Sequence, residues 1–154
     1  MRVMELMTTE AGSCRAYDSV DKGAQIMWEQ DCGAVPVVDQ DGVVVAMLTD
    51  RDICMAAFTQ GRALSEIRVS SAMSQDLWTC RPEDDVALAE DRMRSHQVRR
   101  LPVVDAEGRL VGVLSLSDLA REAGAQARAK AKKKTVKYAD VGETLSLVSS
   151  PGAS

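Results

Sequence analysis

The sequence predicts an α/β fold of the α+β type, in which two copies of a β-α-β-β-α unit pack sheet to sheet with pseudo-twofold symmetry. Three observations predict this fold. The chain of 154 residues aligns with itself after a shift of 66 residues. In each half, an apolar stripe at helical spacing precedes two short extended runs that a Gly-containing turn joins. Each half is also too short to cover both faces of its own sheet, so each copy is expected to complete the core of the other.

The internal repeat is clearest in "VPVVDQDGVVVAMLTDRDI", residues 35–53. This segment aligns without a gap with "LPVVDAEGRLVGVLSLSDL", residues 101–119. Repeats of this length indicate a duplicated structural unit. We therefore divide the chain into a first repeat over residues 1–66, a second repeat over residues 67–122 and a basic, flexible C-terminal tail over residues 123–154.

The first repeat opens with a short extended segment at residues 13–16. Asp18 and Ser19 follow as candidates for the N-cap of a helix. The helix is predicted from an apolar stripe at i, i+4, i+7 and i+8, which consists of Val20, Ala24, Met27 and Trp28. Two strands come next, at residues 34–38 and 43–48, and the turn "DQDG" joins them into a hairpin. A second helix starts directly after the hairpin.

The second repeat has the same elements in the same order. An extended segment at residues 79–81 precedes Asp84 and Asp85, which are candidates for a helix N-cap. The stripe of its first helix consists of Val86, Ala89 and Met93. The strands at residues 101–104 and 109–114 are joined by "DAEG", and a second helix again follows.

The composition predicts a globular protein with a mainly aliphatic core, since 45% of the residues are hydrophobic and only 3% are aromatic. No apolar run approaches the ~18–20 residues that span a bilayer, and the first residues lack the apolar region of a secretory signal. We therefore expect a cytoplasmic protein. Residues 1–120 carry 12 Lys and Arg against 20 Asp and Glu, a net charge of −8. This acidic balance argues against a role in nucleic-acid binding.

The tail differs from the body in charge. Residues 121–154 carry 7 Lys and Arg against 3 Asp and Glu, a net charge of +4. We expect a solvated tail, with a contact to the acidic body of a partner subunit as one alternative. Within the tail, "TLSLV" at residues 144–148 alternates as a short strand or arm would.

Cysteines and catalytic patterns exclude several functions. The four cysteines lie far apart without metal-ligand spacing, so no metal site is predicted and buried thiols are expected: Cys14, Cys32, Cys54 and Cys80. Because the repeat places Cys14 and Cys80 in equivalent positions, a redox switch is an alternative. The chain has one histidine, no phosphate-binding loop and no Ser/His/Asp or Cys/His set. We predict that it is not an enzyme and requires no cofactor.

Each repeat places a hydroxyl and an aspartate at the start of its second helix, in "LTDRDI" and "LSLSDL". A Thr or Ser followed three residues later by Asp is close to a capping box, which stabilises a helix by ~1 kcal/mol without any ligand. The same geometry suits a nucleotide. The helix N-terminus and the hydroxyl can bind a phosphate, and the carboxylate can accept hydrogen bonds from two ribose hydroxyls. Both interpretations stay open at this point.

These two motifs, in fixed order and each after a "PVVD" turn, resemble a tandem pair of cystathionine-β-synthase (CBS) domains, or Bateman module, over residues 2–122. The resemblance implies clefts between the two repeats that bind adenosyl ligands such as AMP, ADP, ATP or S-adenosylmethionine. It also implies a stand-alone regulatory module that signals through a protein partner or through its own dimer. By this resemblance Thr49 and Asp52 serve one cleft, and Ser115 and Asp118 serve the other. The hydroxyl would contact phosphate and the carboxylate would contact ribose.

The resemblance also points to three arginines. Arg100 and its neighbour Arg99 stand where members of this family often place basic residues against phosphate, and Arg51 lies inside the first motif. The counterparts of the Arg99–Arg100 pair in the first repeat are uncharged. Without a dense basic cluster, a triphosphate is less expected than a monophosphate or S-adenosylmethionine. Alternatively, the pair is exposed and forms surface ion pairs worth ~0–1 kcal/mol.

A homodimer is expected because modules that resemble this one pair through their helices. Met27, Met55 and Met93 are candidates for the apolar surface, and their alternative place is the core. The rival function is a ligand-free stress-response scaffold, in which the two helix starts are only capped. The third candidate function is the cysteine-based redox switch.

Overall fold

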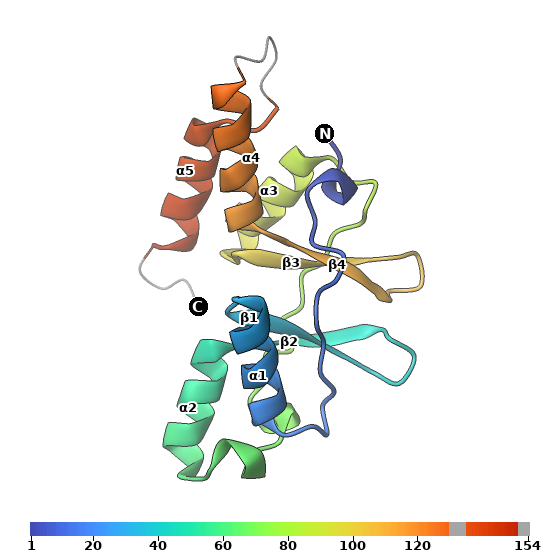
Figure 1. Ribbon diagram of the computed structural model, residues 1–154, viewed down its shortest axis with the longest axis vertical. Coiled ribbons are helices and arrows are strands. Elements are labelled where there is room, and N and C mark those ends of the chain that lie inside the picture. The colour runs from blue at the N-terminus through green and yellow to red at the C-terminus, as the bar shows by residue number, and fades with distance from the viewer. Residues whose placement is uncertain (130–134, 151–154) are drawn as a thin grey trace. The chain divides into compact units, whose positions relative to one another are not determined.

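The computed structural model describes residues 1–129 and 135–150 (Figure 1). Two antiparallel hairpins contain the strands, which are β1 (Ala34–Val38), β2 (Val44–Thr49), β3 (Arg100–Val104) and β4 (Leu110–Ser115). The α-helices of the described residues are α1 (Val20–Gln30), α2 (Asp50–Gln60), α3 (Val86–His96), α4 (Leu116–Arg128) and α5 (Tyr138–Val148). None of them has both the length and the apolar character that crossing a bilayer requires. The mixture of helices and small sheets confirms the predicted α+β class.

The chain forms two compact units, and their composition differs from the sequence repeats at the N-terminus. Unit 1 contains Met1–Thr9, Trp78–Val104 and the described residues from Val111 onward. Unit 2 contains Glu10–Leu77 together with the short segment Asp105–Leu110. The first nine residues of the chain therefore fold with the helices and strands of the second repeat.

Backbone hydrogen bonds explain this exchange of segments. The Val3 N–H donates to the carbonyl of Asp84 at 2.9 Å in unit 1, and 66 residues later the Val69 N–H donates to the carbonyl of Asp18 at 2.8 Å in unit 2. In each unit, a short leading segment thus joins the turn before the first helix of the other repeat. Neither repeat supplies this segment to its own helices.

The same segments add one rung to each hairpin. Thr8 pairs with Val113 of β4 through backbone hydrogen bonds of 2.9 and 3.0 Å. Its equivalent, Ser74, pairs with Met47 of β2 at 2.8 and 3.0 Å. Each hairpin edge is therefore partly covered by backbone, which satisfies donors and acceptors that the edge would otherwise leave open.

In unit 2, α1 and α2 lie on the same side of the β1–β2 hairpin (Figure 1). All five residues of β1 are buried, and β2 alternates between buried and more exposed positions. The core joins α1, both strands and the segment after α2, and its best-buried members are Cys14, Val20, Val35, Val37, Ala46, Leu48, Ile67 and Val69. As predicted from the composition, it contains no aromatic side chain.

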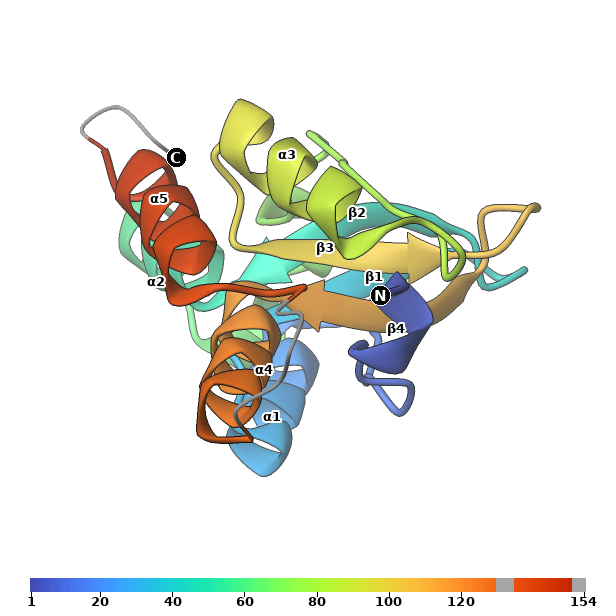
Figure 2. The ribbon, with the colours of Figure 1, turned by 90° about the horizontal axis from the view of Figure 1, so that it is seen from above.

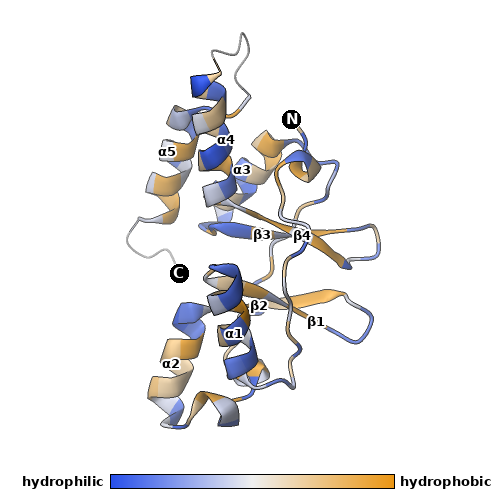
Figure 3. Cartoon of the chain, viewed as in Figure 1, coloured by the Kyte–Doolittle hydropathy of each residue, from blue (hydrophilic) through white to orange (hydrophobic). Residues whose placement is uncertain are grey.

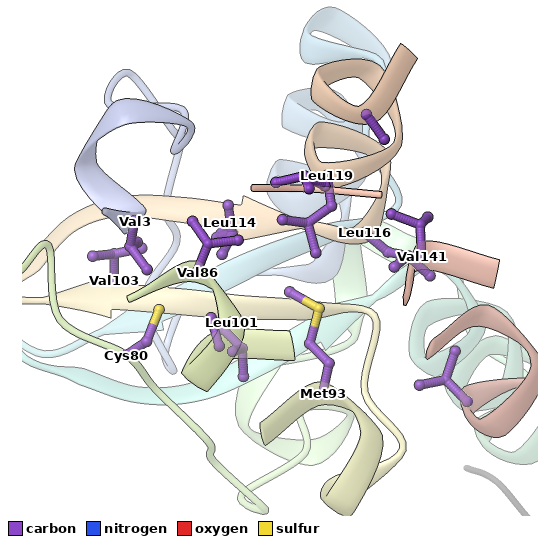
Figure 4. Packing of buried hydrophobic residues seen from close by; sticks show 14 residues of the cluster. Val3, Cys80, Val86, Met93, Leu101, Val103, Leu114, Leu116, Leu119 and Val141 are labelled. Carbon is purple, nitrogen blue, oxygen red and sulfur yellow. The ribbon is translucent and has the colours of Figure 1, made fainter. Parts of the chain in front are cut away.

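In unit 1, α3, α4 and α5 lie on the same side of the β3–β4 hairpin (Figure 1). Seen from above, α3 runs along β3, and α4 continues from the end of β4 (Figure 2). Val3 from the leading segment enters this core beside Val103, and Val141 of α5 lies near Leu116 of α4 (Figure 4). The core therefore draws on the first residues of the chain and on its last helix.

The three methionines that we predicted as candidates for a dimer surface differ in their burial. Met27 and Met93 belong to the two cores and are 8% and 0% exposed, so for them the alternative, a core position, is confirmed. Met55 is 41% exposed on α2. Equivalent positions on the first helix of each repeat thus serve packing within their own units.

The predicted extended segment at the start of each repeat pairs with its hairpin, but through a single bridge rather than a longer strand. The Cys14 N–H donates to the Pro36 carbonyl at 3.1 Å, and the Val38 N–H donates to the Cys14 carbonyl at 2.9 Å. On the N-terminal side of this bridge, the next rung would need an N–H at Pro36, which proline lacks. Pro102 limits the bridge at Cys80 in the same way.

The hairpin turns follow the prediction. Gly42 and Gly108 both have φ of +81°, a left-handed conformation that favours glycine. Side-chain oxygens of Asp39 and Asp105 accept backbone hydrogen bonds within the two turns, at 2.8–3.0 Å. Figure 3 shows that the turns of both hairpins are hydrophilic.

The C-terminal region differs from the expected flexible tail. α5 packs against α3 and α4 and buries Val141, Thr144 and Val148. These residues are spaced i, i+3 and i+7, a helical stripe that outweighs the strand-like alternation of residues 144–148. Residues 130–134 and 151–154 of the predicted tail lie outside the described residues.

Gly112 of β4 makes the close approach of the leading segment possible. A Cβ at this position would lie 2.9 Å from the carbonyl oxygen of Thr8 and 2.9 Å from the sulfur of Met7. We predict that Gly112→Ala lowers the free energy of unfolding by ~1–3 kcal/mol, because the backbone of the leading segment has to move. Urea denaturation measures the change.

Gly142 of α5 provides the matched control for this prediction. A Cβ there meets no atom within 4 Å, so Gly142→Ala should be neutral or should stabilise by up to ~1 kcal/mol. Equal stability of Gly112→Ala and the wild type would contradict the proposed close packing.

Candidate functional site

In unit 2, Thr49 and Asp52 form the start of α2. Thr49 is the N-cap residue; its Oγ1 accepts from the Asp52 N–H at 3.0 Å, and its own N–H donates to Oδ2 of Asp52 at 2.9 Å. This is a complete capping box, so the structural interpretation of the motif is confirmed. Within the described residues, neither Oδ1 of Asp52 nor the hydroxyl hydrogen of Thr49 has a hydrogen-bond partner. The box therefore leaves one acceptor and one donor for another molecule.

In unit 1, Ser115 and Asp118 form the equivalent box at the start of α4. The Ser115 N–H donates to Oδ2 of Asp118 at 2.8 Å, and the Asp118 N–H donates to the Ser115 hydroxyl oxygen at 3.2 Å. Here the hydroxyl also donates to Oδ2 of Asp118, at 2.7 Å. Oδ1 of Asp118 forms an ion pair with Arg121. Both carboxylate oxygens and the hydroxyl are thus engaged within the chain.

Arg121 explains most of this difference, and the sequence reasoning did not include it. It lies three residues after Asp118, on the same face of the helix, where oppositely charged side chains pair. The shift of 66 residues places Met55 at the corresponding position of α2. Asp118 is 7% exposed, whereas Asp52 is partly exposed. The i, i+3 spacing is the signal that could have identified Arg121.

The three predicted arginines are placed separately. Arg51 is exposed on the first turn of α2, next to Asp52. The carbonyl of Arg99 accepts from the Leu116 N–H at 2.9 Å, which brings the Arg99–Arg100 pair to the start of α4 in unit 1. The side chain of Arg99 donates to the Ser149 hydroxyl at 3.0 Å, so it turns toward the end of α5. Each unit therefore combines its own hydroxyl, aspartate and arginine.

A shallow pocket of about 200 Å³ opens beside Asp52 in unit 2. Polar and apolar side chains line it together: Asp52, Met55, Ala56, Thr59, Ser71 and Ala72. The carboxylate that retains an unpaired oxygen thus borders a surface depression.

Cys14 and Cys80 are buried, each 1% exposed. Burial, and secondarily the nearby Asp18, raises the pKa of the Cys14 thiol to about 11. Burial, together with Asp84, raises the pKa of the Cys80 thiol to about 12. Since the thiolate is the reactive form, both positions are unfavourable for a redox switch. In the described part of the chain, no three His, Cys, Asp or Glu side chains gather as metal ligands would.

Comparison with known proteins identifies the family. The CBS domain model matches residues 3–58 and 66–124. The CBS domain-containing protein YhcV of Bacillus subtilis is 40% identical over 118 residues, which are 77% of this chain and 82% of that protein.

Solved structures agree with the fold. A conserved CBS domain protein of unknown function from Thermoplasma acidophilum has a TM-score of 0.75 at 23% identity. The match covers 94% of this chain and 74% of that chain. The structure of CBSX2 in complex with AMP has a TM-score of 0.69 at 25% identity, over 84% of this chain and 98% of that chain. Each matched segment contains one of the two capping boxes. The chain belongs to the CBS domain family and contains two copies of the domain.

Proposed function

We propose that this protein is a non-catalytic regulatory module that binds an adenosyl ligand at its two helix starts and signals through a protein partner or its own dimer. The observation that carries the proposal is the Thr49–Asp52 box, which caps α2 and still leaves a hydroxyl donor and a carboxylate acceptor unpaired within the described residues. A phosphate fits the donor and the helix N-terminus, and ribose hydroxyls fit the acceptor. The complex of CBSX2 with AMP supports this choice of ligand class.

Among adenosyl ligands, AMP and S-adenosylmethionine suit these residues better than ATP. Arg51 is the arginine next to the unit 2 box, and the Arg99–Arg100 pair accompanies the unit 1 box. One or two cations balance a monophosphate, whereas a triphosphate carries more charge than either group neutralises. S-adenosylmethionine is itself cationic and needs only the ribose contacts.

The two boxes should differ in affinity. In unit 2 a ligand meets unpaired groups, whereas in unit 1 it has to displace Arg121 from Asp118 and the Ser115 hydroxyl from the same carboxylate. We therefore propose that the Thr49–Asp52 site fills first. The ligand-free scaffold remains the rival function, because a capping box alone accounts for both motifs.

Asp52→Asn tests the primary site. The free energy of unfolding should change by less than ~1 kcal/mol, since the amide oxygen of Asn can still accept the hydrogen bond from the Thr49 N–H. Binding of AMP or S-adenosylmethionine should weaken roughly 10–100-fold, because each hydrogen bond to a charged group contributes ~1.5–3 kcal/mol. Calorimetry measures the affinity. For the wild type, ligand at ~100 times the dissociation constant should stabilise by ~2.7 kcal/mol, or raise Tm by roughly 5–10 °C.

The control is Asp50→Asn, which removes an equal charge from the same helix turn but leaves the box intact. It should bind like the wild type. Absence of any Tm shift with AMP, ATP or S-adenosylmethionine in the wild type would favour the scaffold.

Arg121→Met tests the unit 1 site. It replaces Arg121 with the residue found at the equivalent position of the first repeat, Met55. The substitution frees Oδ1 of Asp118 from its ion pair, so we expect affinity at the unit 1 site to rise roughly several-fold, the size of a surface ion pair. Calorimetry with Asp52→Asn as the background isolates this site. A further loss of binding would mean instead that Arg121 itself contacts the ligand.

We propose that the partner is a second copy of this chain, paired through α1 and α2. Trp28 and Phe58 are 88% and 79% exposed on these helices. Beside Trp28 lies an apolar groove of about 280 Å³, lined by Ala24, Met27, Trp28, Cys32, Asp50 and Ile53. A twofold interface needs a projection and a groove on the same surface, and this surface has both.

Trp28→Arg should therefore dissociate the dimer. We choose arginine because the second repeat has Arg94 at the equivalent position. Loss of an aromatic anchor from an interface costs ~2 kcal/mol or more, so the affinity of the dimer should fall roughly 30-fold. Sedimentation equilibrium measures the association. Tyr17→Arg, which changes another exposed aromatic residue of unit 2 outside the groove, should leave the dimer intact. Equal association of both variants would contradict the proposed surface.

A further inference from the structure

Glu90 is a buried carboxyl group that lacks a complete set of partners. It lies in the middle of α3 and is 4% exposed, and its Oε1 atom has no hydrogen-bond partner in the described part of the chain. A buried polar atom without a partner costs roughly 1–3 kcal/mol, and more when the group is charged. In a native protein such a group calls for a physical explanation.

The groups that face Glu90 do not compensate for its charge. Arg94, one turn further along α3, pairs with Asp91 at 2.5 Å and lies 3.9 Å from Glu143 of α5. From α5, Asp140 adds a second negative charge toward Glu90. Among the described residues, α4 contributes apolar side chains to this region and no charge that acts on Glu90. Among the described residues, the cation that acts on Glu90, Arg94, is thus shared with other carboxylates.

α5 packs against α3 and α4 in this region, and parts of its surface contribute little to that packing. It buries Val141, Thr144 and Val148 against α3 and α4. Leu145 and Leu147 are 47% and 42% exposed, so two of its larger apolar side chains contribute little to the packing. The hydrogen bonds from α3 and its C-cap residue are long, 3.4 Å from Arg94 to the Thr144 hydroxyl and 3.4 Å from Gln97 to the Leu147 carbonyl. Arg99 donates to the hydroxyl of Ser149, directly after α5, at 3.0 Å.

The other repeat shows the same helix pair without these features. Ala24 and Trp28 of α1 occupy the positions of Glu90 and Arg94. No α-helix of the described residues in unit 2 packs on α1 and α2 as α5 packs on α3 and α4, although the short 3₁₀ helix Leu64–Glu66 contacts α1. The buried carboxyl and the covering helix therefore occur together, in one repeat only.

We propose that α5 is a releasable cover over the α3–α4 surface and that it is released when the Glu90 carboxyl group carries its charge. Docking of α5 removes this carboxyl group from water next to Asp140 and Asp91. Release returns it to water and separates it from Asp140. The uncovered surface is the counterpart of the apolar α1–α2 surface, so release adds a second exposed helix pair to the protein.

The dependence on pH follows from the environment of Glu90. Burial raises the pKa of Glu90 above its ordinary value of 4.5, and Asp140 and Asp91 act in the same direction, while Arg94 opposes them. The docked state thus binds the proton more tightly than the released state. Docking is strongest below pH 4.5, weakens as the pH rises through the raised pKa, and is constant above it. Acidification closes the cover.

Hydrogen exchange of the full chain tests the proposal. We expect the protection of amides 138–148, corrected for the intrinsic rate, to fall as the pH rises from 4.5, roughly tenfold for each unit by which docking raises the pKa. In Glu90→Gln the protection should be independent of pH and at least as high as in the wild type at low pH. Protection of α3 serves as an internal reference for global unfolding.

Two further variants keep the test decisive. Glu83→Gln makes the same change at an exposed glutamate of unit 1 and should retain the pH dependence of the wild type. Glu90→Ala, which copies Ala24 of the first repeat, replaces Glu90→Gln if the latter does not fold. A pH-independent wild type, a Glu90 variant that follows the wild type, or no protection of 138–148 at any pH would each overturn the proposal.

Discussion

The backbone hydrogen bonds of Val3 and Val69 are the constraint on which the two units depend. Each bond ties a leading segment to the turn before a helix of the other repeat. Val3 and Val69 are both 0% exposed, so the same residues that make these bonds also fill the two cores. Gly112 belongs to this arrangement, because the leading segment passes β4 too closely for a side chain there. Because each leading segment is bound to the other repeat, neither repeat can complete its fold without the rest of the chain.

The capping boxes show how a structural motif and a binding motif can share atoms. A helix start needs a hydroxyl oxygen and a carboxylate oxygen, and each of these groups retains further hydrogen-bonding capacity. In unit 2 that capacity is unpaired within the described residues, and in unit 1 Arg121 and Ser115 use it. A substitution at one position, Met55 in unit 2 or Arg121 in unit 1, can therefore change what the aspartate of the same box offers to a ligand without altering the helix start. Stability and ligand affinity can diverge between two copies in this way.

Most of the fold could be predicted from the sequence, because its signals are local. The turns at Gly42 and Gly108, the helix starts at Thr49 and Ser115, and the apolar stripes all depend on residues close in sequence. The exchange of leading segments could not be predicted, since it depends on pairings such as Thr8 with Val113 that leave no periodic pattern. The burial of Glu90 was missed for the same reason, because it depends on elements that meet only in the folded unit. The ion pair of Asp118 with Arg121, by contrast, is local, and its i, i+3 spacing could have predicted it.

The exchange of leading segments also limits how this protein can be divided. A cut between residues 66 and 67 would leave the first fragment with Val3 but without the helix turn at Asp84 that binds it, and the second fragment with Val69 but without Asp18. Neither half would hold a complete domain, although each holds a complete sequence repeat. Each fragment lacks the segment that completes its own core and holds the one that completes the core of the other. We therefore expect the two fragments to assemble when mixed and to fold poorly alone. An engineer who wants one isolated domain would need to transplant the first nine residues onto the second repeat, rather than follow the boundary that the repeat suggests.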